Sequence, residues 1–406
     1  MNVRERLVEM AERTLVHVRA GTTDRTDSVM TIPATHYYDP SRWQDEVEQL
    51  FKRVPLLVAT SAELREPNSY RALEICGIPI IVWRDDQGEV RAFVNMCSHR
   101  GAMLVSEGCG TARRLSCPYH AWTYDQRGEL VGIYKREDFG DIDTSCLGLT
   151  GLRVIERAGL VWVVLSGSLQ LDVDAFFAGY DELLGYCDFS SMNHLASRRL
   201  AGPNWKVAFD GYVDFYHLPI LHKDTFGPSF PSEAVFHRVG PHQRVTVPRG
   251  AWSELEGKPS SEWPDSILTA GVWSVFPHAS IAGFALGEHT IYQVARIYPG
   301  EHAEESITEL DFITTAPLTE EYLRKAQRQI DFLEKVVRDE DYFTGLRIQR
   351  NVRTGAKKEF VFGRNEGGAQ WVHRWINAIL EASDDQLDDL FRRGISTPTA
   401  EQATRK

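Results

Sequence analysis

Two cysteine–histidine pairs that lie close together restrict what this chain can fold into more than any other feature. The first pair is Cys97 and His99, and the second is Cys117 and His120. Two thiolates and two imidazoles can bind one zinc ion. They can also hold a [2Fe–2S] cluster with the cysteines on one iron and the histidines on the other. Either centre requires a rigid scaffold that presents two loops to each other.

The way in which the four ligands are divided between the loops favours the cluster. A zinc finger usually takes both cysteines from one tight turn and both histidines from one helical turn. Here each loop supplies one cysteine and one histidine. The flanking residues are also typical of a Rieske centre: they are Arg100, Gly101, Pro118, Tyr119, Ala121 and Trp122. The stretch Cys97–His120 therefore resembles the Rieske motif.

A second group of candidate ligands lies between residues 204 and 222. His217 and His222 are five apart and so do not share a face of a regular helix. Pro219 lies between them and would distort the helix, which could bring both onto one metal. Asp214 can hydrogen-bond His217 in the way that ligating histidines commonly require. Beside the first motif, this pattern predicts two histidines of the facial triad found in non-haem Fe(II) oxygenases.

The third ligand of such a triad must come from elsewhere, and a long helix predicted from Thr319 to about Ile348 offers three acidic residues. At helical period, Asp339 falls on the polar side of this helix. Glu340 and Asp341 flank its apolar stripe about equally. Periodicity therefore leaves these two as alternatives.

The hydrophobic pattern predicts an α+β protein of four parts. Residues 1–37 are an N-terminal helix and an extended arm, and residues 38–168 are an all-β domain that carries the first motif. Residues 169–385 are an α+β domain with a central antiparallel sheet flanked by helices, and residues 386–406 are a flexible tail. The all-β domain is inserted in or precedes the α+β domain, and short strands between Val54 and Leu165 define it.

Composition excludes several classes of function. The net charge is −12 and no basic tract is present, which argues against nucleic acid or an acidic membrane as a partner. No apolar run reaches membrane-spanning length, and the N-terminus has no signal-peptide core, so we expect a cytoplasmic protein. Four further cysteines should be reduced and structural: Cys76, Cys109, Cys146 and Cys187. No Gly-rich NAD or flavin fingerprint is evident, so a reductase should be a separate chain.

Together these residues resemble the catalytic α subunit of Rieske non-haem iron oxygenases, the aromatic-ring-hydroxylating family, over most of the chain. In that family an acidic pair is followed at fixed spacing by a glutamine and a basic residue. Asp341, Gln349 and Arg350 match this pattern. The resemblance therefore selects Asp341 as the third ligand of a mononuclear Fe(II), beside His217 and His222. The residue before it, Glu340, is the fallback.

The resemblance also implies how the two metal centres cooperate. In this family the subunits form a head-to-tail ring, and the cluster of one subunit serves the iron of its neighbour. Asp214 would then bridge His120 of one subunit to His217 of the next. The catalytic candidates are Asp214, Asp210 and Tyr216. At the position of Asp210 the family often has Glu or Asn.

The activity implied is that of the terminal oxygenase component of a multicomponent system. Such a component uses O2 and NAD(P)H-derived electrons, delivered by a ferredoxin and/or a flavin reductase. We expect hydroxylation of an aromatic or other apolar ring, with dioxygenation favoured and a Rieske monooxygenase or demethylase as the alternative. The assembly would be a homotrimer, with room for a β subunit. Candidate pocket aromatics are Trp273, Phe276, Phe284, Tyr292 and Phe360. Arg296 or Arg353 could bind a substrate carboxylate if buried.

Two hypotheses from other classes compete with this one. A stand-alone Rieske electron-transfer protein would need only the first motif, and it leaves Asp214, His217 and His222 unexplained. A zinc-stabilised binding module without redox chemistry would use the same four ligands for structure alone.

Overall fold

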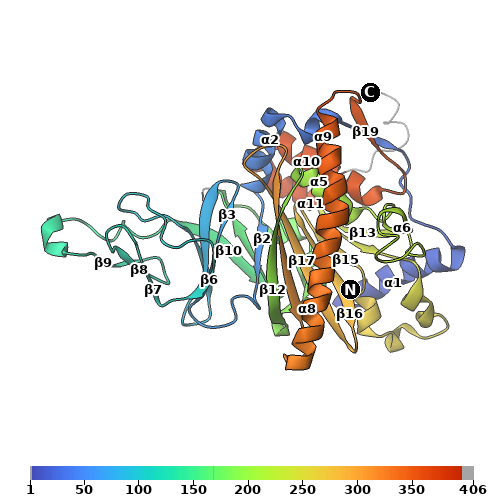
Figure 1. The fold of residues 1–406 in the computed structure, drawn as a ribbon, viewed down its shortest axis with the longest axis horizontal. Helices are drawn as coiled ribbons and strands as arrows, with labels where there is room; N and C mark the ends of the chain where they lie inside the picture. Colours follow the sequence, from blue (N-terminus) through green and yellow to red (C-terminus); the bar gives the residue numbers. More distant parts are fainter. Residues whose placement is uncertain (1, 168, 396–406) are drawn as a thin grey trace. The chain divides into compact units, whose positions relative to one another are not determined.

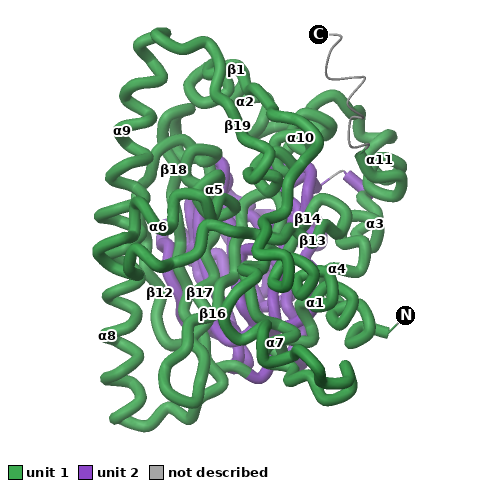
Figure 2. The backbone as a smooth tube through the Cα atoms, turned by 90° about the vertical axis from the view of Figure 1, so that its right-hand side faces the viewer, with its two compact units in different colours: residues 1–50, 171–188, 192–406 green, residues 51–170, 189–191 purple. Residues whose placement is uncertain are grey.

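The computed structural model describes residues 2–167 and 169–395. Its backbone contacts divide the chain into two compact units (Figure 2). Unit 2 consists of residues 51–170 and 189–191, and unit 1 of the described residues before, between and after these segments. No helix in the described ranges is both long and apolar enough to cross a bilayer.

Unit 2 is built from short antiparallel strands. One sheet has the order β2-β11-β10-β5-β4-β3-β6, and a smaller one has the order β7-β8-β9. The strands are β2 (Leu56–Thr60), β3 (Ser69–Ile75), β4 (Ile78–Arg84), β5 (Val90–Val94), β6 (Gly108–Thr111), β7 (Arg114–Ser116), β8 (Thr123–Asp125), β9 (Leu130–Gly132), β10 (Gly151–Arg157) and β11 (Leu160–Val164). This confirms the predicted all-β module.

Unit 1 is organised around a seven-stranded antiparallel sheet of order β12-β18-β17-β16-β15-β14-β13. Its strands are β12 (Asn193–Gly202), β13 (Val235–Val239), β14 (His242–Thr246), β15 (Val272–Val275), β16 (Ala279–Leu286), β17 (His289–Pro299) and β18 (Ser306–Thr314). The central strand β17 is buried on both faces over much of its length. Both faces must therefore be covered by other elements, as expected for an α+β domain.

Helices supply that cover in unit 1. They are α1 (Val3–Ala20), α2 (Pro40–Glu46), α3 (Val173–Phe177), α4 (Tyr180–Gly185), α5 (Trp205–Val213), α6 (Leu218–Leu221), α7 (Asp265–Leu268), α8 (Glu320–Val336), α9 (Phe343–Val352), α10 (Gly367–Glu381) and α11 (Leu387–Arg393). Helix α5 contacts β17 and β18, and α8 contacts β12 and β16. Helices α8 and α9 run end to end beside the strands (Figure 1). The fold is the predicted α+β sheet flanked by helices.

Local sequence signals explain where several helices begin. The Asp39 side chain accepts hydrogen bonds from the backbone N–H groups of Ser41 and Arg42, and Pro40 occupies the first turn of α2. Thr319 caps α8 in the same way. The buried residues of α8 follow the predicted stripe: they are Tyr322, Ala326, Ile330, Leu333 and Val336. The N-terminal arm ends in β1 (Met30–Pro33), which pairs with β19 (Glu359–Phe362) of unit 1.

The structure differs from the sequence-based expectation at three places. The helix expected from Thr319 to Ile348 is interrupted by a π-helical segment, Val337–Tyr342, between α8 and α9. Residues 38–50, which were expected in the all-β domain, belong to unit 1. Part of the expected flexible tail, residues 386–406, forms α11, because Leu387, Leu390 and Phe391 are buried. The remainder, residues 396–406, lies outside the described residues.

Candidate functional site: two metal centres

The two cysteine–histidine loops of unit 2 have the same backbone design. Cys97 N–H donates to the carbonyl of Ala102, and Gly101 N–H donates back to the carbonyl of Cys97. Cys117 repeats both bonds, from its own N–H to the Trp122 carbonyl and from the Ala121 N–H to its own carbonyl.

Both loops turn through a left-handed residue. Gly101 has φ 75° in the first loop and Ala121 has φ 56° in the second. Strands β5 and β6 flank the first loop, and β7 and β8 flank the second. The two loops therefore have equivalent backbone conformations, and each is held between two strands.

The four candidate ligands of these loops fit a shared cluster. Cys97 and Cys117 are buried and are not joined in a disulfide. The imidazole rings of His99 and His120 lie 4.8 Å apart. Nδ1 of His120 is buried and has no hydrogen-bond partner among the described residues. A buried ring nitrogen without a partner is costly in a protein alone, but it is suited to bind a metal.

Aromatic side chains surround this centre. The Trp122 ring stacks on His99 at 4.8 Å and 8°, and Phe139 covers both rings edge-on. The Tyr124 hydroxyl lies 3.3 Å from Sγ of Cys97 and accepts the N–H of Ser98 at 3.0 Å. Burial, and then the contact with Cys97, raises the pKa of Tyr124 to about 12. Its hydroxyl therefore remains protonated at neutral pH and can donate to the sulfur.

The second centre lies in unit 1, where the chain leaves α5. His217 and His222 cap the two ends of the single-turn helix α6, so their rings come within 5.2 Å of each other. Pro219 lies in the first turn of α6, where a missing N–H costs nothing. Pro219 thus lies at the start of a short helix between the two histidines. The spacing had predicted a longer helix that this proline would distort.

His217, His222 and Asp341 each place one ligand atom within 4.8 Å of the others. Nε2 of His217 is 3.6 Å from Oδ1 of Asp341, and Nε2 of His222 is 3.3 Å from the same oxygen. Two imidazoles and one carboxylate are the donor set of a non-haem Fe(II) facial triad. These three residues could hold such an ion.

The other ring nitrogen of each histidine is held by a carboxylate. Nδ1 of His217 lies 3.2 Å from Asp214, and Nδ1 of His222 lies 2.5 Å from Glu340. These contacts orient both Nε2 atoms toward Asp341, as in carboxylate–histidine–metal arrangements. Burial lowers the pKa of His222, but its contacts with Asp341 and Glu340 outweigh burial and raise it. The site therefore has the electrostatics of a cation-binding centre.

Both candidates for the third ligand lie in the π-helical segment. Glu340 and Asp341 are consecutive, and in a regular helix their side chains would point about 100° apart. In the wider turn Val337–Tyr342 one contacts Nδ1 of His222 and the other contacts Nε2. Asp339 pairs with Arg338 at the surface, as its place on the polar side predicted.

Asp210 is anchored by two buried side chains, Tyr37 and His373. Its carboxylate accepts the Tyr37 hydroxyl at 2.8 Å and lies 2.9 Å from Nε2 of His373. Burial, and then the charge of Asp210, raises the pKa of Tyr37 well above its usual value, so this phenol remains a donor. Tyr216 is 62% exposed, and its backbone N–H donates to Asp214.

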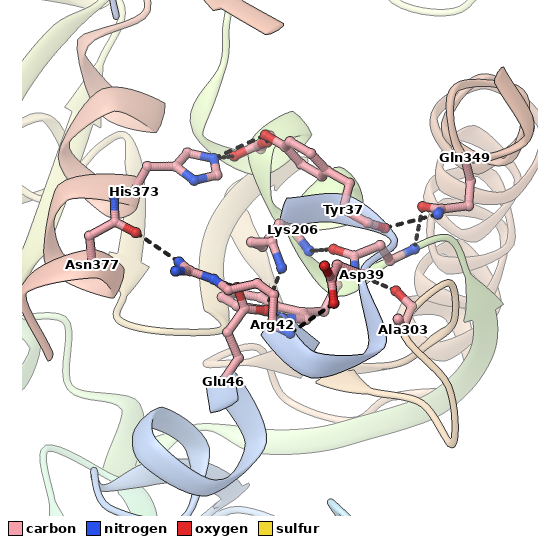
Figure 3. A network of polar contacts seen from close by, with 12 residues as sticks. Tyr37, Asp39, Arg42, Glu46, Lys206, Ala303, Gln349, His373 and Asn377 are labelled. Carbon is pink, nitrogen blue, oxygen red and sulfur yellow. Dashed lines mark hydrogen bonds and ion pairs between the residues drawn. The ribbon is translucent and has the colours of Figure 1, made fainter. Parts of the chain in front are cut away.

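A buried polar network ties α5 and α9 to α2 and to Tyr37, which precedes α2 (Figure 3). Glu46 accepts Lys206 and the indole N–H of Trp205, and it also pairs with Arg42. The Gln349 amide accepts the backbone N–H of Asn204 and donates to the carbonyl of Tyr37. Sequence reasoning missed Tyr37, Glu46 and His373. One available signal was the lysine within the apolar run of α5, because a buried lysine requires an acidic partner.

The triad lies in the wall of a cavity of about 440 Å³. Of the five aromatic residues expected there, Phe284 lines it and the other four do not. Phe215, Phe226 and Phe230 line it instead. The expected carboxylate-binding arginines are engaged elsewhere, Arg296 with Asp311 and Arg353 with Glu304.

Two family models match consecutive parts of the chain. Residues 54–142 match the Rieske [2Fe–2S] domain, and residues 189–382 match the ring hydroxylating alpha subunit (catalytic domain). These matches contain both candidate metal centres.

Among curated proteins, three relatives are oxygenases of ammonium compounds. The chloroplastic choline monooxygenase of Beta vulgaris is 30% identical over 53% of this chain and 51% of its own length. The glycine betaine monooxygenase oxygenase subunit of Chromohalobacter salexigens is 31% identical over 48% and 43%. The carnitine monooxygenase oxygenase subunit of Acinetobacter baumannii is 30% identical over 55% and 60%. The chain thus spans about half the length of these relatives.

Solved structures share the fold over nearly the whole chain. The quaternary ammonium Rieske monooxygenase CntA, in complex with an inhibitor, has a TM-score of 0.73 at 23% identity and covers 86% of this chain and 95% of its own. Naphthalene 1,2-dioxygenase from Rhodococcus sp. has a TM-score of 0.72 at 19% identity, with coverage of 92% and 98%. With its Rieske domain, its catalytic domain and this fold, the chain belongs to the family of Rieske oxygenase α subunits.

Proposed function

We propose that this protein is the terminal oxygenase component of a Rieske monooxygenase that hydroxylates a quaternary ammonium compound. The observation that carries the proposal is the convergence of His217, His222 and Asp341 in the wall of a largely apolar cavity. The resemblance found in the sequence favoured dioxygenation of an aromatic ring. The curated relatives are monooxygenases by name, and they support its alternative instead.

In this proposal Cys97, His99, Cys117 and His120 hold a Rieske cluster, and the triad holds a mononuclear Fe(II). The bound iron supplies O2 activation, and the cluster supplies electrons. The overall reaction adds one oxygen atom to a C–H bond and reduces the other to water, consuming O2, two electrons and two protons. The electrons come from NAD(P)H through a separate ferredoxin or flavin reductase.

The protein's own residues contribute orientation and exclusion of water. Asp214 and Glu340 hold the imidazoles so that one face of the triad is left for substrate and O2. Phe226 packs against His222 with ring centroids 5.5 Å apart, and Phe230 packs on Phe226 at the same distance. These rings shield the site from water and offer π faces to an onium group.

Electron delivery to the iron is proposed to cross between subunits. The side chain of Asp214 is 21% exposed. One of its oxygens holds His217 and the other accepts the backbone N–H of Tyr216, but a carboxylate oxygen can accept more than one hydrogen bond. It could therefore also accept an N–H from outside its own chain. We propose that this donor is His120 of a neighbouring copy in a homotrimer. A stand-alone electron-transfer protein or a zinc module would need no second centre of this kind.

The test has two steps. Metal and sulfide analysis with an EPR spectrum of reduced protein should give about three irons and two acid-labile sulfides per chain, with a Rieske signal. The holoenzyme with a reductase and NADH should then oxidise choline, carnitine or glycine betaine with no more than one ¹⁸O from ¹⁸O2 in the organic product, since a hydrate or carbinolamine can lose its label to water. Both atoms in one product would mean dioxygenation. Zinc without sulfide would refute the proposal.

A further inference from the structure

Two uncharged polar side chains, Ser280 and Gln293, form a polar spot in the wall of the cavity. Ser280 of β16 and Gln293 of β17 both line the cavity and are 2% and 5% exposed. The ladder pairs Ser280 with Ala295 and Ala282 with Gln293. Ser280 and Gln293 are therefore diagonal neighbours on one face of the sheet, close enough for one small group to contact both.

Within the part of the chain that the structure describes, neither polar side chain stabilises the fold through a hydrogen bond. Within the described ranges, no hydrogen bond joins the Gln293 amide or the Ser280 hydroxyl to another protein group, and neither is sealed from the cavity. A nearly buried amide that lacks a partner lowers stability. Both groups therefore suit a hydrogen-bonding partner inside the cavity.

The charges around the cavity restrict what that partner can be. Its described lining includes no lysine and no arginine. The charged or titratable groups in the lining are His217, His222 and Asp341, which form the proposed triad, Asp214, which holds one of them, and Tyr212. Burial raises the pKa of the Tyr212 phenol well above its usual value, so this group is uncharged. A substrate carboxylate that lies away from the triad would be desolvated with no side-chain cation to pair with. A hydroxyl group carries no such penalty and can both donate to and accept from an amide.

We propose that Gln293 and Ser280 form a specificity site that hydrogen-bonds an uncharged hydroxyl group of the substrate. The cavity then selects a quaternary ammonium alcohol over the corresponding ammonium carboxylate. The onium group is held by the aromatic wall, and the hydroxyl by the polar spot. This inference rests on the proposed function and narrows its substrate class.

The experiment is calorimetric titration of the anaerobic holoenzyme with three ligands. Choline carries the hydroxyl, ethyltrimethylammonium lacks it, and glycine betaine carries a carboxylate. We expect choline to bind roughly fivefold more tightly than ethyltrimethylammonium, since one neutral hydrogen bond distinguishes them. Glycine betaine should bind more weakly than both. Equal binding of choline and ethyltrimethylammonium, or tightest binding of glycine betaine, would overturn the inference.

Variants assign the preference to the two residues. Gln293→Leu and Ser280→Ala should each reduce the preference for choline toward unity and leave the affinity for ethyltrimethylammonium unchanged. Gln327→Leu makes the same change on the exposed face of α8 and is the matched control. Iron content and the cluster spectrum report whether each variant has folded.

The outcomes separate this inference from the proposed function. If the enzyme oxidises choline but Gln293→Leu and Ser280→Ala leave the ligand preference unchanged, the specificity site is refuted and the proposed function stands. If the three ligands neither bind nor are oxidised, both proposals fail together.

Discussion

At the residue scale, the two acidic residues that periodicity could not separate have different tasks. Asp341 approaches Nε2 of both histidines, whereas Glu340 contacts Nδ1 of His222 and the hydroxyl of Thr225. A carboxylate on the metal side of the imidazoles can be a ligand. A carboxylate on the far side can only orient the ring and raise its basicity. The geometry therefore supports Asp341 as the ligand and Glu340 as its support.

This division of tasks predicts different metal affinities. Asp341→Ala should abolish mononuclear iron binding, because the triad loses a ligand. Glu340→Ala should weaken iron binding by about 10- to 100-fold, and excess Fe(II) should restore occupancy. Iron analysis during an Fe(II) titration, with the cluster spectrum as the internal control, measures both. The reverse pattern, with Glu340→Ala beyond rescue, would exchange the two assignments.

At the element scale, the π-helical segment is what allows consecutive residues to serve one site. Without the extra residue α8 and α9 would form one regular helix, in which the turns on its two sides are rotated by about 100° relative to the present structure. Glu340 and Asp341 would then not both keep their present directions toward His222. Insertions of this kind occur often at functional sites. The segment has two buried side chains, Val337 and Tyr342, at its two ends, and α8 and α9 have buried residues of their own on either side of it.

Removal of one residue from this segment should therefore damage the site and spare the fold. Deletion of Asp339, an exposed residue, should restore a regular helix and turn one carboxylate out of the site. We expect loss of mononuclear iron with unchanged helical circular dichroism and an intact cluster signal. Asp339→Ala keeps the extra residue and should retain the iron. Normal iron content in the deletion variant would show that the wider turn is not needed.

The network at the start of α5 is a second feature of this scale, and it leads to a prediction about stability. Lys206 and Glu46 are both buried, and burial lowers the pKa of Lys206. Glu46→Gln strands this ammonium group and should lower the free energy of unfolding by about 3–5 kcal/mol. Lys206→Met should cost less, since Arg42 still pairs with Glu46.

Thermal unfolding of the three proteins, followed by circular dichroism, gives the order of stability. The wild type should be the most stable and Glu46→Gln the least. A Lys206→Met variant that unfolds at a lower temperature than Glu46→Gln would contradict this account of the network.

At the scale of the whole molecule, the two metal centres lie in separate compact units, each with its own strands. The proposed electron path between copies depends on Asp214. Asp214→Asn should keep the iron and the cluster but slow reoxidation of the reduced cluster by O2 and substrate, because the bridging anion is lost. Stopped-flow absorbance of the cluster in a single turnover measures this rate. An unchanged rate would refute the bridge.

Electron transfer between copies requires the assembled oligomer, so the oligomeric state must be measured. Two controls are therefore needed. The molecular mass in solution should be that of a trimer in both the wild type and Asp214→Asn. Asp331→Asn makes the same change at an exposed carboxylate of α8, and this variant should reoxidise at the wild-type rate. A monomeric wild type with full activity would exclude transfer between copies.

The sequence by itself determined the metal chemistry and the element types. The ligand types and spacings at Cys97–His120 and at His217 and His222 predict the donor sets, because thiolates and imidazoles are rare in such patterns without a metal. The strands and caps followed from local signals, such as Asp39 before Pro40, which act over a few residues.

Only the tertiary structure decided how distant residues meet. Helical periodicity could not separate Asp341 from Glu340 and only the family resemblance favoured Asp341, whereas the structure shows which carboxylate approaches which nitrogen of His222. The anchoring of Asp210 by Tyr37 and His373 joins three segments far apart in the chain. Most of the aromatic residues predicted to line the cavity do not line it. Trp273, for example, is buried in the core and packs on Tyr180. Local patterns constrain local conformation and donor chemistry, whereas the packing of the whole sheet decides which side chains face the site.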